Sequence, residues 1–221
     1  MDLNKSKEFF DPAMLEQKKC HIIGCGAIGS SVAELLARAG VEDIVLWDED
    51  IVESHNIANQ MFTQKHLHMA KTTALSQIIK DINPECNVQE KDFYKEQNLA
   101  GYVFLCVDNI DLRREIATFN KYNTNIIMMF DFRMRLVDGQ CYAAKWDDIK
   151  KQESFIDSMQ FTHEEAVAQT PVSACGFTLS VASTVRVLTS LGVANFMNYV
   201  RKQEYKHLIL ADAFEAFVES Y

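Results

Sequence analysis

Three glycines near the amino terminus are spaced as in loops that bind phosphate groups. Gly24, Gly26 and Gly29 form a G-x-G-x-x-G pattern directly after the apolar run CHII and before a helical pattern. Such glycines permit a tight turn, a close approach of the backbone to a phosphate, and close packing of the helix on the strand. The free N–H groups and the dipole at the start of that helix favour an anion. The glycine pattern alone is weak evidence for a phosphate-binding loop. The strand before the glycines and the helix after them strengthen the inference.

Polar side chains gather in the segment DEDIVESHNIANQ, which begins at Asp48. Asp48 ends the second strand-like run, where a ribose-binding acid is expected. Carboxylate and amide groups follow at Asp50, Asn56, Asn59 and Gln60, and they are placed to bind an adenosine and its phosphates. The segment therefore indicates a nucleotide site. A solvated acidic loop after a glycine turn is the alternative.

Three further side chains help to separate ATP from NAD. Lys71 opens the next helical pattern, where it can face phosphates that an NAD site does not need to neutralise. Asp108 and Asn109 end a later strand, at the edge where ligands bind in parallel sheets. A carboxylate there can hold Mg²⁺ together with phosphates and water. Lys71 as a solvated helix residue and Asp108 as a helix cap are the alternatives, and the three together favour ATP with Mg²⁺.

The elements that position these residues alternate between strand and helix. CHIIGCG, DIVLWDED, NVQEKDF and GYVFLCVDN have the apolar character of strands, whereas SSVAELLARAG and KTTALSQIIKDINPE have helical spacing. Gly40 and the pair Asn83 and Pro84 are suitable stops for the two helices. This β-α-β order predicts an α/β fold of Rossmann type, with a mostly parallel sheet and helices on both faces.

The second half of the chain predicts a C-terminal extension of extra strands and a long apolar helix. TNIIMMFDFRM is typical of one more strand, and GQCYAAKWD of a strand outside the parallel core. The polar stretch 147–170 has weak periodicity, and we expect a mobile loop or a segment that crosses over the site. GFTLSVASTVRVLTSLGVANFMNYVRK is apolar and helical, and the tail HLILADAFEAFVESY closes the chain.

Composition limits the class of protein. The chain has 221 residues, of which 48% are hydrophobic and 24% charged, as in ordinary globular proteins. A net charge of -9 argues against a general nucleic-acid partner, although a local phosphate site is compatible with it. No apolar run reaches the length of a signal peptide or a membrane span, so we expect a cytoplasmic protein without membrane contact.

The cysteines are scattered, and most lie in apolar, strand-like runs. No C-x-x-C pair is present, so we expect free buried thiols in a reducing compartment and no zinc. The six are Cys20, Cys25, Cys86, Cys106, Cys141 and Cys175.

The ordered set of motifs resembles the ThiF/MoeB/HesA family, the bacterial relatives of ubiquitin-activating (E1) enzymes. The resemblance covers roughly residues 9–196 and rests on IIGCGAIGSSVAELLARAGVEDIVLWDEDIVESHNIANQ, AKTTALSQIIKDINP and FLCVDNIDLRREIATFN. It implies one adenylation domain over residues 1–221. Within that domain we expect a lead-in helix or arm (1–19), a nucleotide-binding core (20–135), and a crossover loop with a C-terminal extension (136–221).

The resemblance also implies an activity. Members of the family bind ATP and Mg²⁺ and adenylate the C-terminal carboxylate of a ubiquitin-like or sulfur-carrier protein, or of a peptide. They use a helix like the one near the carboxyl end of this chain in a twofold dimer, so a homodimer is expected. The matching positions are Gly24, Gly26, Ala27 and Gly29 for the phosphate loop, Asp48 for the ribose, Asn56 and Gln60 for the nucleotide, Lys71 for phosphates and Asp108 for Mg²⁺.

The chain departs from the family pattern at Asn59, where an arginine that contacts the triphosphate is usual. A neutral amide does not replace a bidentate guanidinium. Arg133, Arg135 or Lys65 is a candidate substitute. Otherwise the protein binds nucleotide but activates its partner weakly or not at all. An NAD(P)-dependent oxidoreductase is a third hypothesis, against which Lys71 and the HNIANQ segment argue.

Cys175 lies in TPVSACGF, just before the long apolar helix. In relatives, a cysteine in this neighbourhood takes the activated partner as a thioester or persulfide, and a helix N-terminus lowers the pKa of such a thiol. The alternative is a small buried residue at the start of the helix, which Ala174 and Gly176 beside it would permit.

Overall fold

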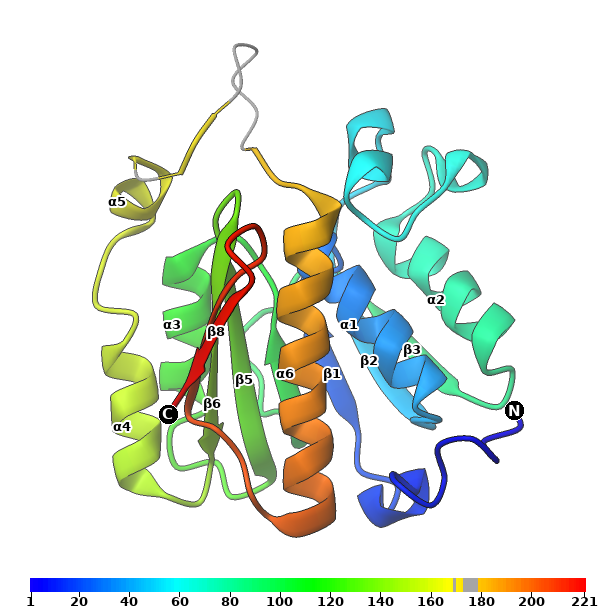
Figure 1. Ribbon diagram of the computed structural model, residues 1–221, viewed down its shortest axis with the longest axis horizontal. Coiled ribbons are helices and arrows are strands. Elements are labelled where there is room, and N and C mark those ends of the chain that lie inside the picture. Colours follow the sequence, from blue (N-terminus) through cyan, green and yellow to red (C-terminus); the bar gives the residue numbers. More distant parts are fainter. Residues whose placement is uncertain (169, 173–178) are drawn as a thin grey trace.

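The computed structural model describes residues 1–168, 170–172 and 179–221. One eight-stranded sheet runs through them in the order β3-β2-β1-β4-β5-β6-β7-β8 (Figure 1). The strands are β1 (Cys20–Ile23), β2 (Asp43–Trp47), β3 (Asn87–Lys91), β4 (Gly101–Leu105), β5 (Ile126–Met134), β6 (Asp138–Lys145), β7 (Leu208–Asp212) and β8 (Phe217–Ser220).

Helices and single 3-10 turns connect the strands. The α-helices are α1 (Ala27–Arg38), α2 (Lys71–Ile82), α3 (Ile110–Phe119), α4 (Ile149–Asp157), α5 (His163–Ala168) and α6 (Ala182–Lys202). The 3-10 turns are η1 (Pro12–Leu15), η2 (Ser54–Ala58) and η3 (Gln64–His66).

The sheet is parallel through its first five strands and antiparallel beyond them. β1 pairs in parallel with β2 and β4, and β5 pairs in parallel with β4 but antiparallel with β6. β1 and β4 are buried along their whole length, as expected of strands covered on both faces. The predicted Rossmann-type sheet is therefore confirmed, and β6, β7 and β8 are the predicted extra strands.

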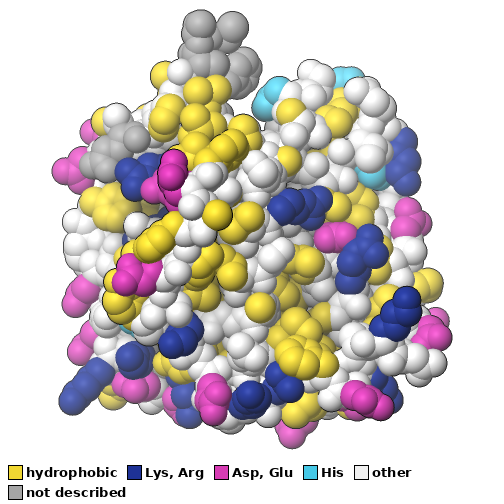
Figure 2. Space-filling view, viewed as in Figure 1, with side chains coloured by type: hydrophobic (Ala, Val, Ile, Leu, Met, Phe, Trp, Pro, Cys, Tyr) yellow, Lys and Arg dark blue, Asp and Glu magenta, His cyan; other side chains and the backbone are white. Residues whose placement is uncertain are grey.

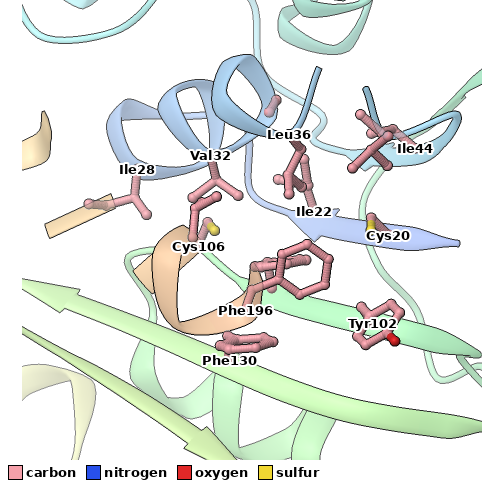
Figure 3. Packing of buried hydrophobic residues seen from close by; sticks show 14 of the residues in the cluster. Cys20, Ile22, Ile28, Val32, Leu36, Ile44, Tyr102, Cys106, Phe130 and Phe196 are labelled. Atoms are coloured by element: carbon pink, nitrogen blue, oxygen red, sulfur yellow. The ribbon is translucent and has the colours of Figure 1, made fainter. Parts of the chain in front are cut away.

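Helices cover both faces of the sheet, as predicted. α1, α2 and α6 pack on one face, where Ile22, Val32, Phe130 and Phe196 belong to a single buried cluster (Figure 3). α3 and α4 lie on the other face, over a second cluster that includes Phe155. The crossovers that join the parallel strands thus bury the central strands β1 and β4 and leave the carboxyl ends of the strands for ligands.

The prediction of a mobile loop over residues 147–170 is wrong. The segment contains α4 and α5 instead. The Asp148 side chain caps α4 by accepting hydrogen bonds from the Lys150 and Lys151 N–H groups, and Phe155 packs on Trp146 with ring centroids 5.7 Å apart. Only Gln152 and Phe155 of the nine residues in α4 are buried, which explains the weak periodicity of the sequence.

The long apolar helix is confirmed as α6, which packs beside α1 (Figure 1). Its Phe196 ring meets Tyr102, Phe104 and Phe130, with centroids 5.0, 5.4 and 5.9 Å away. Nearer its start, the buried hydroxyls of Ser31 and Thr189 are 2.8 Å apart and join α1 to α6. Within the described residues, none of the helices combines the length and the apolar character that crossing a membrane requires.

The described cysteines are buried and free, as predicted. Burial raises the pKa of their thiols, in the case of Cys86 to about 11, so these groups stay neutral. They are Cys20, Cys25, Cys86, Cys106 and Cys141. Cys175 lies outside the described residues.

Candidate functional site

The glycine loop joins β1 to α1 at the carboxyl edge of the parallel strands. Gly24 has φ +94°, and a Cβ on it would lie 2.7 Å from the Val107 backbone nitrogen. A Cβ on Gly29 would lie 1.8 Å from the Gly24 carbonyl oxygen. Gly26 precedes α1, and a Cβ on it would meet no atom of the described residues within 4 Å. The protein itself requires Gly24 and Gly29, whereas Gly26 faces open space before a helix N-terminus, which suits an anion.

These glycines give a matched pair of substitutions. We expect Gly29→Ala to lower the free energy of unfolding by about 1–3 kcal/mol, because the new methyl group would overlap backbone. Gly26→Ala should cost less stability than Gly29→Ala, since a Cβ on Gly26 would meet no backbone. Urea unfolding of both variants measures the difference. Equal losses would contradict this account of the loop.

Asp48 ties the glycine loop to the end of β2. One carboxylate oxygen accepts a hydrogen bond from the Cys25 N–H (2.6 Å), and the other accepts one from the Asp50 N–H (2.9 Å). Burial raises the pKa of this half-buried carboxyl, while Lys71 and the two N–H groups act against that shift. Asp48 therefore shapes the loop, and its role toward a ribose stays a prediction.

Lys71 is buried at the first position of α2. Its ammonium lies 2.7 Å from an Asp50 carboxylate oxygen, and its backbone N–H donates to the Asp50 carbonyl. The lysine side chain is 10% exposed and the aspartate side chain 66% exposed. Lys71 is thus not a solvated helix residue. It is held toward the loop that follows β2.

The segment around Asn56 and Gln60 carries an unsatisfied acceptor. Asn56 is buried and accepts a hydrogen bond from the Glu53 N–H in the capping box that begins η2. The side-chain oxygen of Gln60 is buried without a partner among the described residues. Buried polar atoms are normally paired, so a missing donor indicates a ligand or water at this position. Asn59 is half-buried at the end of η2.

Asp108 presents a free carboxylate beside the glycine loop. Asn109, not Asp108, caps α3: its side-chain oxygen accepts from the Asp111 and Leu112 N–H groups. Asp108 is exposed and forms no ion pair or hydrogen bond within the described residues. No three His, Cys, Asp or Glu side chains of that same part of the chain are grouped to hold a metal. A lone carboxylate fits Mg²⁺, which takes its other ligands from phosphates and water.

The three cations considered in place of an arginine at position 59 all have acidic partners. Arg133 donates to a carboxylate oxygen of Asp131 (2.6 Å) and to the backbone and hydroxyl oxygens of Ser158 (2.7 Å each). Arg135 lies 3.0 Å from an Asp138 oxygen, and Lys65 lies 3.5 Å from an Asp81 oxygen. Of these, the structure binds Arg133 most firmly.

The network around Asp131 was not predicted from the sequence. This fully buried carboxylate on β5 lies between Arg113 of α3 and Arg133. Arg113 also donates to the carbonyl oxygens of Val107 and Phe132. The turn that carries Asp108 is therefore fastened to the end of β5. An acidic residue inside the apolar run MMFDFRM could have indicated this network, because a buried charge needs partners of opposite charge.

Comparison with known proteins places this site in a family context. A model of the ThiF family matches residues 11–217. The tRNA threonylcarbamoyladenosine dehydratase of Haemophilus influenzae is 32% identical over 120 residues, which are 50% of this chain and 46% of that protein. Ubiquitin-like modifier-activating enzyme 5 of Aedes aegypti is 26% identical over 123 residues, 47% of this chain and 31% of that protein. The chain thus spans less than half the length of these relatives.

Solved structures share the fold over nearly the whole chain. Escherichia coli MccB with MccA-N7isoASN superposes with a TM-score of 0.75 at 16% identity, over 95% of this chain and 66% of that one. MccB with ATP also gives a TM-score of 0.75, at 17% identity, over 95% of this chain and 65% of that one. At these identities the likeness concerns the fold.

Proposed function

The chain belongs to the ThiF family, and on that premise we propose that it is an ATP-dependent adenylyltransferase. Its substrate is the C-terminal carboxylate of a small ubiquitin-like or sulfur-carrier protein, or of a peptide. One observation carries the proposal: the free Asp108 carboxylate lies at the sheet edge where Gly26 faces open space and Lys71 is held in a buried position. These are the groups that a magnesium triphosphate needs.

The reaction mainly requires that the partner carboxylate is aligned with the α-phosphate and that the phosphate charge is neutralised. A carboxylate oxygen of the partner bonds to the α-phosphorus of ATP, the bond from that phosphorus to the bridging oxygen breaks, and pyrophosphate leaves. The N–H groups at the start of α1 and the Lys71 ammonium would bind the phosphates. Asp108 would hold Mg²⁺, which offsets phosphate charge when bound. Asp48, Asn56 and Gln60 would contact the nucleoside.

The relatives and the net charge support this class of partner. One relative is named as an activator of a ubiquitin-like modifier, and MccB has been crystallised with MccA and with ATP. The dehydratase relative is named for a tRNA nucleoside, but a net charge of -9 disfavours tRNA for this chain. A homodimer and a later transfer to Cys175 stay predictions.

A nucleotide-binding protein without catalysis is the second candidate. Asn59 and the firm binding of Arg133 by Asp131 and Ser158 favour it, because they leave fewer cations for the triphosphate. Both candidates require ATP to bind. They differ in whether an adenylate forms.

Lys71→Gln tests the phosphate site. We expect it to weaken ATP binding in the presence of Mg²⁺ by about ten- to a hundredfold, the scale of one hydrogen bond to a charged group. Calorimetry measures the affinity, and ATP–pyrophosphate exchange with purified small proteins ending in Gly-Gly measures activation. The fold should persist, because the partner Asp50 is mostly exposed.

Lys121→Gln is the matched control, because Lys121 pairs with Glu153 and follows the C-terminal end of α3, opposite the end of that helix that lies next to Asp108. Its ATP affinity should equal that of the unaltered protein. Equal affinity in both lysine variants would contradict the assignment of Lys71. Tight ATP binding without exchange or adenylate across the panel would favour the second candidate.

A further inference from the structure

The predicted phosphate site is rich in carboxylates and poor in cations. Asp48, Asp50 and Asp108 lie around the glycine loop, and the Lys71 ammonium is already paired with Asp50. A triphosphate would add more negative charge at the same edge of the sheet. Mg²⁺ would offset part of this charge, and a further cation would reduce the repulsion that remains.

Arg186 brings a positive charge to this edge from the start of α6. Its guanidinium donates to the Ser31 hydroxyl (3.0 Å), lies 3.5 Å from a Glu34 carboxylate oxygen, and contacts the Met61 sulfur. The side chain is 44% exposed. Arg186 therefore lies in the seam where α1, α6 and the residues following Gln60 meet.

The segment next to Arg186 is part of the predicted site. The Met61 N–H donates to the Ser30 hydroxyl (3.1 Å), which holds residues 60–61 against the first turn of α1. The Gln60 side-chain oxygen, immediately before Met61, is the buried acceptor without a described partner. Gly26, at the N-terminus of the same helix, faces empty space. Ser31, which Arg186 contacts, comes one helical turn, about 5.4 Å of axial rise, after the first residue of α1. The N–H groups that favour an anion are at that first turn.

The present contacts of Arg186 are ones it can leave. Glu34 also pairs with Arg38, and the Ser31 hydroxyl also bonds with Thr189, so neither group would lose its last partner. Figure 2 shows Lys and Arg side chains beside Asp and Glu side chains on the face of the molecule that carries α6 and α1. Arg113 and Arg133, by contrast, are held by the buried Asp131.

We propose that Arg186 is a phosphate-binding residue, whose guanidinium leaves Glu34 and Met61 to bind the terminal phosphates of ATP at the glycine loop. The inference rests on the proposed function, since it places ATP at this site. A guanidinium is suited to the task, because its planar fork donates two parallel hydrogen bonds to a phosphate. A residue of α6 is thereby added to the site, where it would bind the phosphates of ATP that follow the α-phosphate.

The test compares ATP with AMP, because AMP lacks the phosphates that Arg186 would bind. Calorimetry with Mg²⁺ should show that Arg186→Gln weakens ATP binding about ten- to a hundredfold and leaves AMP binding unchanged. Arg201→Gln is the matched control, since Arg201 lies at the far end of α6 over the Phe9 ring. Asn59→Arg introduced into the Arg186→Gln variant should restore part of the ATP affinity, because residue 59 lies near Met61.

The outcomes separate this inference from the proposed function. If the unaltered protein binds ATP and Arg186→Gln binds it equally well, the role of Arg186 is overturned and the proposed function stands. An equal loss of ATP and AMP binding also overturns the role of Arg186, because the residue would then not be contacting the phosphates that ATP has and AMP lacks. Failure of the unaltered protein to bind ATP overturns both.

Discussion

Asp108→Asn is expected to remove nearly all ATP–pyrophosphate exchange while the fold stays intact. The proposed reaction places Mg²⁺ on this carboxylate, and an amide of the same shape carries no charge for the metal. Loss of one preorganised electrostatic contact typically lowers the rate by about 10²–10³-fold. Asp108 has no hydrogen bond or ion pair among the described residues, so thermal unfolding should be unchanged. Exchange assays and thermal melts on the same preparations measure the two effects.

Asp111→Asn is the matched control for that substitution. Asp111 lies one helical turn away in α3, where it pairs with Arg114 and accepts from the His163 N–H. Exchange should survive its neutralisation, because Asp111 is occupied by those contacts. Undiminished exchange in Asp108→Asn, or an equal fall in both variants, would remove Asp108 from the metal site.

The parts of the site that were predictable from the sequence depend on neighbours in the chain. The glycine loop, Asp48 and Lys71 each lie at the end of a short strand or the beginning of a helix, and the strand-helix alternation placed them at one sheet edge. That placement is confirmed by the parallel pairing of β1, β2 and β4. The chemical roles of these residues stay predictions.

The parts that were not predictable depend on contacts between distant segments. In the sequence, Arg186 is one polar residue within an apolar helical pattern. It contacts Ser31, which lies 155 positions earlier in the chain. The error over residues 147–170 has the same origin. α4 is held by the packing of Phe155 on Trp146 and by its Asp148 cap, whereas its exposed face lacks any periodic apolar signal. Tertiary packing decides such segments more than local propensity does.

The Asp131 network should be the largest single contribution to stability near the site. We expect Asp131→Asn to lower the free energy of unfolding by roughly 3–5 kcal/mol, because it leaves the charges of Arg113 and Arg133 without a buried counterion. Arg113 also binds the Val107 carbonyl, so the turn before Asp108 should loosen and nucleotide affinity should fall with stability. Urea unfolding measures the first effect and calorimetry the second.

Asp138→Asn is the control that tells whether burial or ion pairing alone accounts for the loss of stability in Asp131→Asn. Asp138 also pairs with an arginine, Arg135, but both side chains are partly exposed. Its loss should cost only about 0–1 kcal/mol, as for other exposed pairs. Similar losses of unfolding free energy in the two variants would mean that burial of Asp131 does not increase its contribution to stability. A large loss confined to Asp131→Asn would show that the carboxylate holds two guanidinium groups in the interior. That role explains why Arg133 is the least free of the three cations considered in place of an arginine at position 59.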